Sequence, residues 1–283
     1  MATRNLHLLV IDPQNDFCDL PAGACGDAKP SLPVTGAHAD MQRVARLIDQ
    51  AGAGLTAITV TLDTHRRLDI AHPGFWRRGD GTAVSPFTPI TAHDVRSGAY
   101  VPRLPGAAPR VLAYLDTLEA AGRYTHMVWP VHCEVGTWGH NVHSDLGSAC
   151  SRWEESTLEH ITWISKGMNP WTEHFSAVQA EVPDADDPST ERNYLFLETL
   201  RPADNVFIAG EAGSHCVRST TEHIAEFFAD ERLSRFVLLE DCMSPVAGFE
   251  REQAIFLREM RARGLQIATC ADARQALLAN ACP

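Results

Sequence analysis

The stretch NVFIAGEAGSHCVRSTTEHI, residues 205–224, contains the signals that decide the fold. Residues 205–209 form a short apolar run that predicts a buried strand, and a glycine-containing turn follows. From Cys216 to about residue 228 the pattern becomes that of an amphipathic helix. A strand, a turn and a helix in this order are typical of the βαβ units of α/β proteins. We therefore expect a mainly parallel sheet with helices on both faces.

The same alternation continues on both sides of this stretch. Further strands are predicted at 7–12, 55–61, 161–165, 235–240 and 265–269, and further helices at 36–51, 109–121, 189–200 and 249–263. Residues 73–123 interrupt the rhythm because they are rich in proline and glycine. Since no repeat or linker divides the chain, we interpret them as an insertion in a single domain spanning 1–283. The prediction is a three-layer α/β/α domain.

Apolar content and charge narrow the range of functions. The chain has 283 residues, of which 45% are hydrophobic, and this is enough for a sizeable buried core. The formal net charge is −12, so a surface that binds nucleic acid or an anionic membrane would have to form against the overall field. Small-molecule chemistry is therefore favoured over nucleic-acid or membrane binding.

The N-terminal segment and the cysteines indicate the cellular compartment. The segment MATRNLHLLVID has one arginine and then a strand pattern, without the features of a signal peptide, and no apolar run approaches the length of a membrane span. The eight cysteines form no CxxC pair, which argues against a disulfide framework and a zinc ribbon. We expect a cytoplasmic protein in which most thiols are small buried hydrophobes.

Three polar side chains stand at the ends of predicted strands, where an open α/β sheet places its ligands. Asp12 ends the first strand, Lys166 follows the strand at 161–165, and Cys216 begins a helix. Because the helix N-terminus and the lysine both favour a thiolate, we expect the pKa of Cys216 to be depressed. Asp12 would accept the thiol proton and later return it to a leaving amine. Taken singly, the three residues also fit turn capping, solvation and burial.

A second group of residues combines one carboxylate with several imidazoles. Its members are Asp63, His65, His72 and His132. Such a set suits Zn²⁺, Fe²⁺ or Mn²⁺ and does not choose among them. The alternative is a chance cluster, since the chain has 13 histidines. His140 and His143 are near His132 in the sequence, and we assign them to structure or to the pocket rim.

Five motifs, in their order along the chain, resemble those of the nicotinamidases within the isochorismatase-like cysteine hydrolases. They are LLVIDPQNDFC, LDTH, WPVHCEVGTWGHNVH, SKGMNPWTEHFSA and FIAGEAGSHCVRSTTEHI. The resemblance implies a six-stranded parallel sheet and a catalytic triad of Asp12, Lys166 and Cys216. It also implies a divalent metal, zinc first and iron or manganese as alternatives, on the four ligand candidates, as well as a homo-oligomer.

The resemblance also implies a reaction. The thiolate of Cys216 would attack a small carboxamide such as nicotinamide, ammonia would leave, and water would hydrolyse the thioester. Backbone N–H groups of Ala212 and Cys216 would hold the oxyanion, and the peptide bond between Glu211 and Ala212 would be cis. Phe17 and Trp129 would sandwich a flat ring.

His215, directly before the nucleophile, is assigned to the same substrate pocket. For the aromatic pocket residues, ordinary core packing is the alternative.

Three positions near Cys216 depart from the family pattern. Gly213 and Ser214 stand where the family usually has Thr-Asp, and Glu211 occupies a position that is commonly aliphatic. Two alternatives therefore remain open. One is a hydrolase with the same triad that acts on a carbamoyl, ureido or maleamate-type amide, with the metal structural or absent. The other is a catalytically silent metal-binding protein. The insertion at 73–123 would form a lid or a subunit contact.

Overall fold

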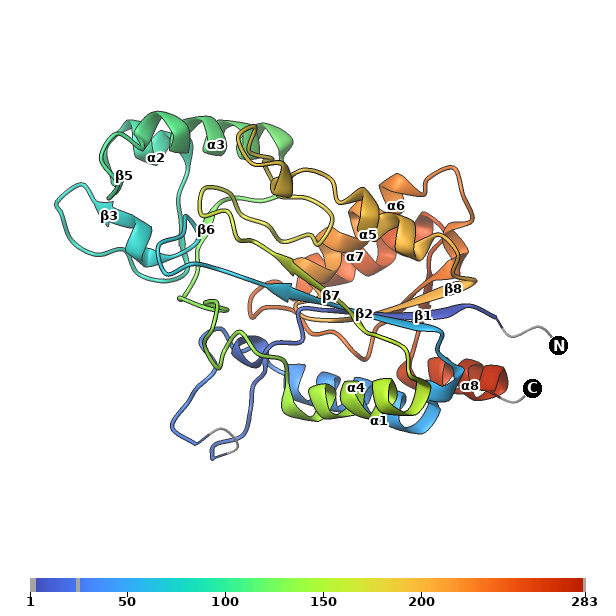
Figure 1. The fold of residues 1–283 in the computed structure, drawn as a ribbon. Helices are drawn as coiled ribbons and strands as arrows, with labels where there is room; N and C mark the ends of the chain where they lie inside the picture. The colour runs from blue at the N-terminus through green and yellow to red at the C-terminus, as the bar shows by residue number, and fades with distance from the viewer. Residues whose placement is uncertain (1–3, 24–25, 282–283) are drawn as a thin grey trace.

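The structure is a computed structural model that describes residues 4–23 and 26–281. Its centre is a sheet of six parallel strands in the order β10, β9, β8, β1, β2 and β7 (Figure 1). The strands are β1 (Leu6–Ile11), β2 (Ala57–Asp63), β7 (Thr162–Lys166), β8 (Asn205–Gly210), β9 (Phe236–Leu239) and β10 (Gln266–Ala268). The predicted six-stranded parallel sheet is confirmed.

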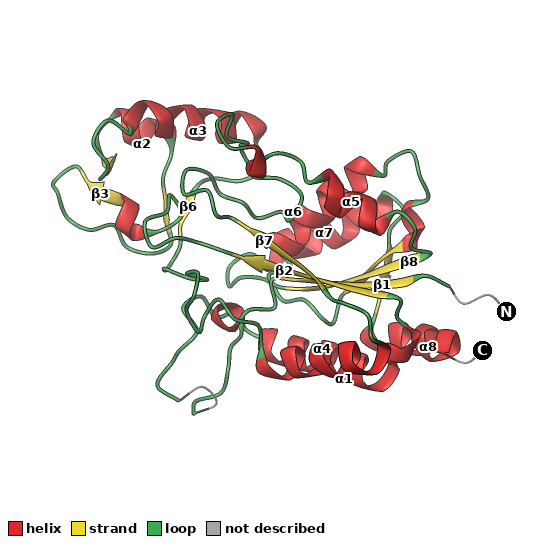
Figure 2. Ribbon diagram, viewed as in Figure 1, coloured by secondary structure: helices red, strands yellow, loops and turns green. Residues whose placement is uncertain are grey.

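Helices cover both faces of the sheet, which gives the predicted three layers (Figure 2). One layer consists of α1 (Ala37–Ala51), α4 (Ser144–Thr157) and α8 (Cys270–Ala281). The other consists of α5 (Tyr194–Leu200), α6 (Cys216–Phe227) and α7 (Glu250–Ala262). The sequence patterns predicted neither α4 nor α8. Helix α5 begins five residues later than the expected position 189, because a short 3₁₀ turn precedes it.

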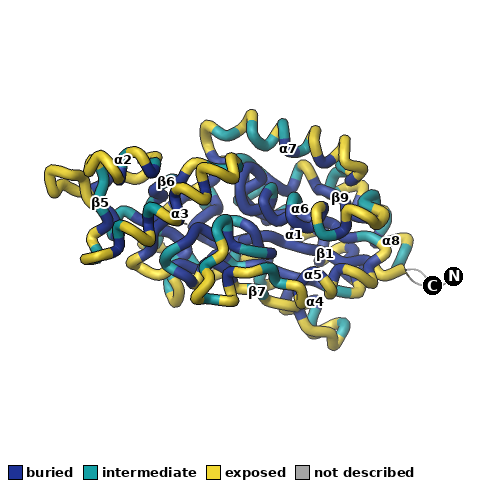
Figure 3. The backbone as a smooth tube through the Cα atoms, turned by 90° about the horizontal axis from the view of Figure 1, so that it is seen from above, coloured by how far each residue is buried: buried dark blue, intermediate teal, exposed yellow. Residues whose placement is uncertain are grey.

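The apolar side chains of β1 point alternately to the two faces of the sheet, and they pack against both helix layers. Leu8 and Val10 pack in the apolar cluster on the α1 side, whereas Leu9 and Ile11 pack in the cluster on the α6 side. Successive side chains of a strand point to opposite faces, so one central strand contributes to two cores. The inner strands β1, β2, β8 and β9 are accordingly mostly buried, while the edge strands β7 and β10 and the outer faces of the helices carry exposed residues (Figure 3).

The predicted insertion forms a group of elements at one end of the molecule (Figure 1). These elements are β3 (Trp76–Arg78), β4 (Thr88–Pro89), α2 (Ala92–Arg96), β5 (Tyr100–Pro102) and α3 (Ala108–Ala121), and β4 pairs with β6 (Met127–Val128). They enclose an apolar cluster of their own, in which Phe75, Trp76 and Leu115 are buried. The remaining helical turns are 3₁₀ turns at Asn15–Phe17, Gly52–Gly54, Pro73–Phe75, Pro188–Thr190 and Leu233–Arg235.

The thiols lie mostly inside the protein. The described cysteines are all free: Cys18, Cys133, Cys150, Cys216, Cys242 and Cys270. All but Cys270 are buried, as predicted, and Cys25 and Cys282 lie outside the described residues. Among the described helices, none combines the length and the apolar character that a membrane span requires.

Gly210 is the last residue of β8 and packs directly against the backbone of β1. A Cβ atom on this residue would lie 2.0 Å from the backbone oxygen of Ile11 on the neighbouring strand β1. Its φ of 125° is also a value that side-chain-bearing residues rarely adopt. Only glycine therefore lets the two strands approach here.

Replacing Gly210 by alanine should destabilise the fold far more than replacing another glycine with positive φ. Gly122 also has a positive φ, but a Cβ there would meet nothing within 4 Å. We expect Gly122→Ala to cost about 1 kcal/mol through backbone strain alone, and Gly210→Ala at least about 3 kcal/mol because of the added clash. Urea unfolding of both variants measures the difference. Equal costs would contradict the close approach of β8 and β1.

Candidate active site

The three strand-end residues meet at the carboxyl edge of the sheet. Asp12 directly follows β1, Lys166 is the last residue of β7, and Cys216 is the first residue of α6. The ammonium nitrogen of Lys166 lies 2.9 Å from Asp12 Oδ2 and 3.7 Å from Cys216 Sγ. All three side chains are buried. The structure thus brings together the residues predicted as a triad, although their catalytic role stays a prediction.

Lys166 is shared between two carboxylates. Its ammonium group also lies 2.8 Å from Asp63 Oδ1, because β7 pairs with β2 and places Lys166 opposite Asp63. Burial alone would lower the pKa of Lys166, but the negative charges of Asp12 and Asp63 raise it well above its usual range. Burial raises the pKa of Asp12, and the ammonium group opposes this rise. Lys166 is therefore a fixed cation, and Asp12 is a carboxylate that binds a proton more readily than usual.

The thiol of Cys216 differs from the prediction in the direction of its pKa shift. Burial raises the pKa of Cys216 well above its usual value; Lys166 opposes this, while Asp12 and Asp63 add to the rise. The expected depression is therefore wrong. Sequence reasoning counted the helix N-terminus and the lysine, but the two carboxylates neutralise that lysine. The thiol holds its proton, and Asp12 is the nearest base.

Beside the triad lies a buried cluster of three imidazoles and one carboxylate. The ligand nitrogens of His65, His72 and His132 all lie within 4.8 Å of one another. Asp63 Oδ2 is 3.0 Å from His65 Nε2 and 3.3 Å from His132 Nε2. Burial and the neighbouring imidazoles lower the pKa of His72 to about 2, so this ring is neutral and able to bind a metal.

Each imidazole of the cluster is oriented by an acceptor on its other ring nitrogen. His72 Nδ1 is hydrogen-bonded to the Arg66 carbonyl at 3.2 Å and His132 Nδ1 to the Pro130 carbonyl at 2.8 Å. His65 Nδ1 lies at ion-pair distance from Asp69 Oδ2, at 3.1 Å. Such bonds are typical of metal-binding histidines, because they fix the ring and the protonated nitrogen. The four predicted ligands are therefore brought together, and this donor set fits Zn²⁺, Fe²⁺ or Mn²⁺.

The two other candidate histidines lie outside this cluster. His140 Nε2 is 3.0 Å from the hydroxyl of Thr64, and His143 Nε2 is 2.8 Å from His38 Nδ1. Both are thus engaged in local hydrogen bonds.

The turn between β8 and α6 presents backbone donors beside the thiol. The peptide bond between Glu211 and Ala212 is cis, as the family resemblance implied. Within residues 4–23 and 26–281, neither the Ala212 N–H nor the Cys216 N–H donates a hydrogen bond. Two free donors at the start of a helix fit the stabilisation of an oxyanion on a carbonyl attacked by Cys216.

Aromatic side chains enclose a small cavity next to Cys216. The predicted pocket residues Phe17, Trp129 and His215 all line it; the rings of Trp129 and His215 are 5.3 Å apart and perpendicular. Sequence reasoning missed four further lining residues, which are Leu32, Glu173, Phe175 and Val246. Glu173 and Phe175 lie in the motif SKGMNPWTEHFSA, so their spacing from Lys166 could have indicated them. The cavity volume is about 20 Å³, little more than one water needs.

A larger cavity of about 230 Å³ adjoins this pocket. It shares Trp129, Phe175 and His215 with the first cavity, and Arg123 and Arg218 line its outer part. The three shared residues are thus the wall between the buried site and a wider space.

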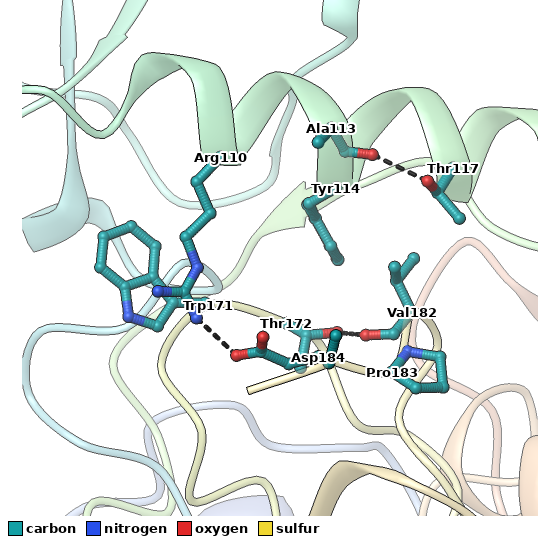
Figure 4. Close-up of a pocket in the computed structure, with 10 residues that line it drawn as sticks. Arg110, Ala113, Tyr114, Thr117, Trp171, Thr172, Val182, Pro183 and Asp184 are labelled. Atoms are coloured by element: carbon teal, nitrogen blue, oxygen red, sulfur yellow. Dashed lines mark hydrogen bonds and ion pairs between the residues drawn. The ribbon is translucent and has the colours of Figure 1, made fainter. Parts of the chain in front are cut away.

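The pocket drawn in Figure 4 lies elsewhere, between α3 and residues 171–185. The guanidinium group of Arg110 stacks on the ring of Trp171 at 4.3 Å from its centroid and pairs with Asp184. Asp184 therefore neutralises the positive charge of Arg110. None of the residues of the triad or of the imidazole cluster lines this pocket. We assign it to the contact between the insertion and the segment that follows β7.

Comparison with known proteins identifies the fold. No protein-family model matches the chain, and no curated protein does. Among solved structures, the yeast nicotinamidase bound to the inhibitor nicotinaldehyde is similar with a TM-score of 0.62 and 22% identity, over 93% of this chain and 99% of that one. A zinc complex of the Pyrococcus horikoshii pyrazinamidase follows at 0.52 and 19%, over 94% and 99%. An isochorismatase-like hydrolase from Alkaliphilus metalliredigens has 0.52 and 16%, over 96% and 98%. The chain has the fold of these hydrolases.

Loss of any one imidazole of the cluster should release a bound divalent metal. We expect His65→Ala, His72→Ala and His132→Ala each to weaken zinc affinity by more than about 100-fold, and Asp69→Asn to weaken it about 10- to 100-fold through ring orientation. The exposed His160→Ala serves as the control. Elemental analysis and zinc titration measure the effect. Unchanged metal content in all three imidazole variants would contradict a metal site here.

The raised pKa of Cys216 predicts opposite effects of its two charged neighbours on thiol reactivity. In metal-stripped protein at pH 7, Asp12→Asn should speed alkylation of Cys216 and Lys166→Met should slow it, each by up to about tenfold per unit of pKa change. In the unchanged protein the rate should rise with pH through pH 9, because the thiol loses its proton only above its usual range. Mass spectrometry of iodoacetamide adducts measures the rates.

Cys150 is the internal control for this experiment. Burial raises its pKa to about 12, and it lies in α4 far from Asp12, so its rate should not respond to either substitution. Slower alkylation of Cys216 in Asp12→Asn would show that the carboxylate does not raise this pKa.

Proposed function

We propose that this chain is a cysteine-dependent amidohydrolase that releases ammonia from a small carboxamide. The observation that carries the proposal is the buried contact of one lysine with both an acid and a thiol: Lys166 Nζ lies 2.9 Å from Asp12 and 3.7 Å from Cys216. Free backbone donors and an enclosed aromatic cavity lie next to the same thiol. The fold, shared with solved nicotinamidases and pyrazinamidases, supports the same reaction class.

In the proposed first half of the reaction, Asp12 takes the proton of the Cys216 thiol as the sulfur attacks the amide carbonyl. Lys166 balances the negative charge that develops on sulfur and carboxylate. The oxyanion is held by the N–H groups of Ala212 and Cys216. The C–N bond then breaks, and Asp12 returns its proton to the leaving nitrogen, which departs as ammonia and leaves a thioester.

In the second half, water attacks the thioester carbonyl and Asp12 accepts a proton from that water. The C–S bond then breaks, Asp12 returns the proton to the sulfur of Cys216, and the carboxylic acid leaves. The raised pKa values of the two groups suit these roles. A carboxylate with a raised pKa is a stronger base, and a thiolate of high pKa is a stronger nucleophile.

Asp63, His65, His72 and His132 are proposed to hold a divalent metal, with zinc first because the similar Pyrococcus horikoshii pyrazinamidase was solved in complex with zinc. When bound, such an ion supplies a Lewis-acid site at the cavity wall for a ring nitrogen of the substrate or for a water in its place. The chain's own contribution is to fix the ligands and to keep the site buried. Asp63 also links this metal position to the triad, since its other oxygen faces Lys166.

The lining of the cavity favours a flat, uncharged substrate, with nicotinamide as the first candidate. A volume of about 20 Å³ cannot hold a six-membered ring with a carboxamide, so the wall must move on binding. Outward rotation of Trp129, Phe175 and His215 would join the cavity to the adjoining space of about 230 Å³. These three side chains are the proposed gate for the substrate.

A second candidate is a hydrolase of the same mechanism that acts on a carbamoyl, ureido or maleamate-type amide. Gly213 and Ser214 favour it, because they supply no carboxylate beside the nucleophile where nicotinamidases usually have Thr-Asp. Ser214 instead bonds His215 at 2.9 Å and accepts a hydrogen bond from Val246 N–H at 3.1 Å. Ser214 and His215 both line the adjoining cavity of about 230 Å³, from which they would contact a different acyl group.

Ammonia release from a panel of amides tests the proposal. The panel contains nicotinamide, pyrazinamide, maleamate, ureido acids and biuret, each with zinc-loaded protein. We expect turnover of at least one member, and a loss of at least about 1,000-fold in kcat for Cys216→Ala, because the nucleophile is removed. Cys150→Ala removes another buried thiol and should retain full activity. Ammonia release that survives in Cys216→Ala would refute the mechanism.

A further inference from the structure

Two acidic side chains are buried together on the far side of the oxyanion turn. Glu211, the residue before Ala212, is fully buried, and Asp40 in the first turn of α1 is 2% exposed. Asp40 pairs with Arg43, whose Nη2 lies 2.6 Å from Asp40 Oδ1 and whose side chain is 36% exposed. Two carboxylates with one partly exposed guanidinium leave a buried negative charge unless one acid holds a proton.

The hydrogen bonds show which oxygen needs this proton. Glu211 Oε2 accepts from the Ser244 N–H at 3.1 Å, and Asp40 Oδ2 accepts from the Ser244 hydroxyl at 2.6 Å. Asp40 Oδ1 accepts from Arg43. Glu211 Oε1 is buried and has no donor among the described residues. A proton on Glu211, donated to Asp40, satisfies this atom and removes the excess charge.

The same network braces the turn that carries the oxyanion donors. The carbonyl of Ser244 accepts from the Gly213 N–H at 2.8 Å, and the carbonyl of Cys242 accepts from the Gly210 N–H at 2.9 Å. Residues 210–213 are thereby tied to the loop after β9 on both sides of Ala212. The Glu211 side chain adds a further bond between the turn and this loop, because its Oε2 accepts a hydrogen bond from the Ser244 N–H.

We propose that Glu211 is a positioning residue of the active site: as a neutral carboxylic acid bonded to Asp40 and Ser244, it fixes the turn that aims the Ala212 N–H at the reacting carbonyl. This rests on the proposed amidohydrolase function. Glu211 does not touch the cavity, so it acts only through the backbone of the turn.

Burial and the charge of Asp40 raise the pKa of Glu211 well above its usual value. The titratable and charged groups near Glu211 and Asp40 are Cys18 and Asp19 after the 3₁₀ turn Asn15–Phe17, Arg43 on α1, and Cys242 after β9. Because the pKa in the folded state is raised, the stabilising bond is present at low and neutral pH and is lost as pH rises through that pKa. The turn should therefore loosen in alkaline solution.

Two substitutions distinguish a hydrogen-bonding role of the neutral Glu211 side chain from a role in packing alone. Glu211→Gln is neutral at every pH, can accept from the Ser244 N–H and can donate to Asp40, so kcat at pH 7 should stay within about threefold. Glu211→Met fills the space without hydrogen bonds and should lower kcat at least about tenfold with little change in KM. The alkaline fall of kcat in the unchanged enzyme should disappear in Glu211→Gln. An identical alkaline limb in both would overturn the proposal.

Two readouts do not need turnover and keep the proposal testable if no amide is hydrolysed. The infrared spectrum of the folded protein at pH 7 should contain a protonated-carboxyl band that is missing in Glu211→Gln. The melting temperature of the unchanged protein should fall in alkaline solution more steeply than that of Glu211→Gln. Absence of the band, together with parallel melting curves, would overturn the role of Glu211. Failure of the amide panel alone would overturn only the function on which it rests.

Discussion

The candidate site depends on the buried ammonium group of Lys166. Its nitrogen lies 2.9 Å from Asp12 and 2.8 Å from Asp63, and both carboxylates are buried. A buried carboxylate that loses its partner costs about 3–5 kcal/mol. Removing the lysine would take the ion-pair partner from Asp12 and leave Asp63 with the imidazoles of His65 and His132. Register makes the arrangement possible: β2 lies between β1 and β7, and its last residue Asp63 pairs directly with Lys166. The lysine can therefore reach both acids from the edge strand.

This shared cation couples the thiol to the metal position. Asp63 has one oxygen on Lys166 and the other on His65 and His132. A divalent ion bound by the imidazoles would compete with Lys166 for Asp63 and leave more of the positive charge to the thiol. Since Asp63 contributes to the raised pKa of Cys216, occupancy of the metal position would act in the direction of a more reactive sulfur. A metal at this position could therefore influence the pKa of Cys216 through Asp63, without contacting the sulfur.

Much of the fold was predictable because the central strands are continuous apolar runs, whose length and flanking turns identify them in the sequence. The helices that were missed lack an equally clear pattern. In α4, Gly147 and several serines lower helix propensity, and Trp153 and Cys150 are among only a few buried positions. In α8, Ala273 and Leu277 are the buried residues, so the helix is rich in alanine but carries no broad apolar stripe. Tertiary packing rather than local pattern determines these two elements.

The site was predictable to the extent that strand order brings strand ends together, which explains why Asp12, Lys166 and Cys216 were found. The sign of the pKa shift at Cys216 was not predictable, because it depends on burial and on Asp63, which sequence reasoning had assigned only to the metal. The same limit applies to Glu211. Its departure from an aliphatic position was visible in the sequence, but a buried acid acquires meaning only from its contacts. Those contacts come from α1 and from the loop after β9, far away along the chain. A buried carboxyl group beside another carboxyl group is costly unless one of them carries a proton. Because Glu211 is tied to the turn before Cys216, such a proton would make it a hydrogen-bond donor held in a fixed position.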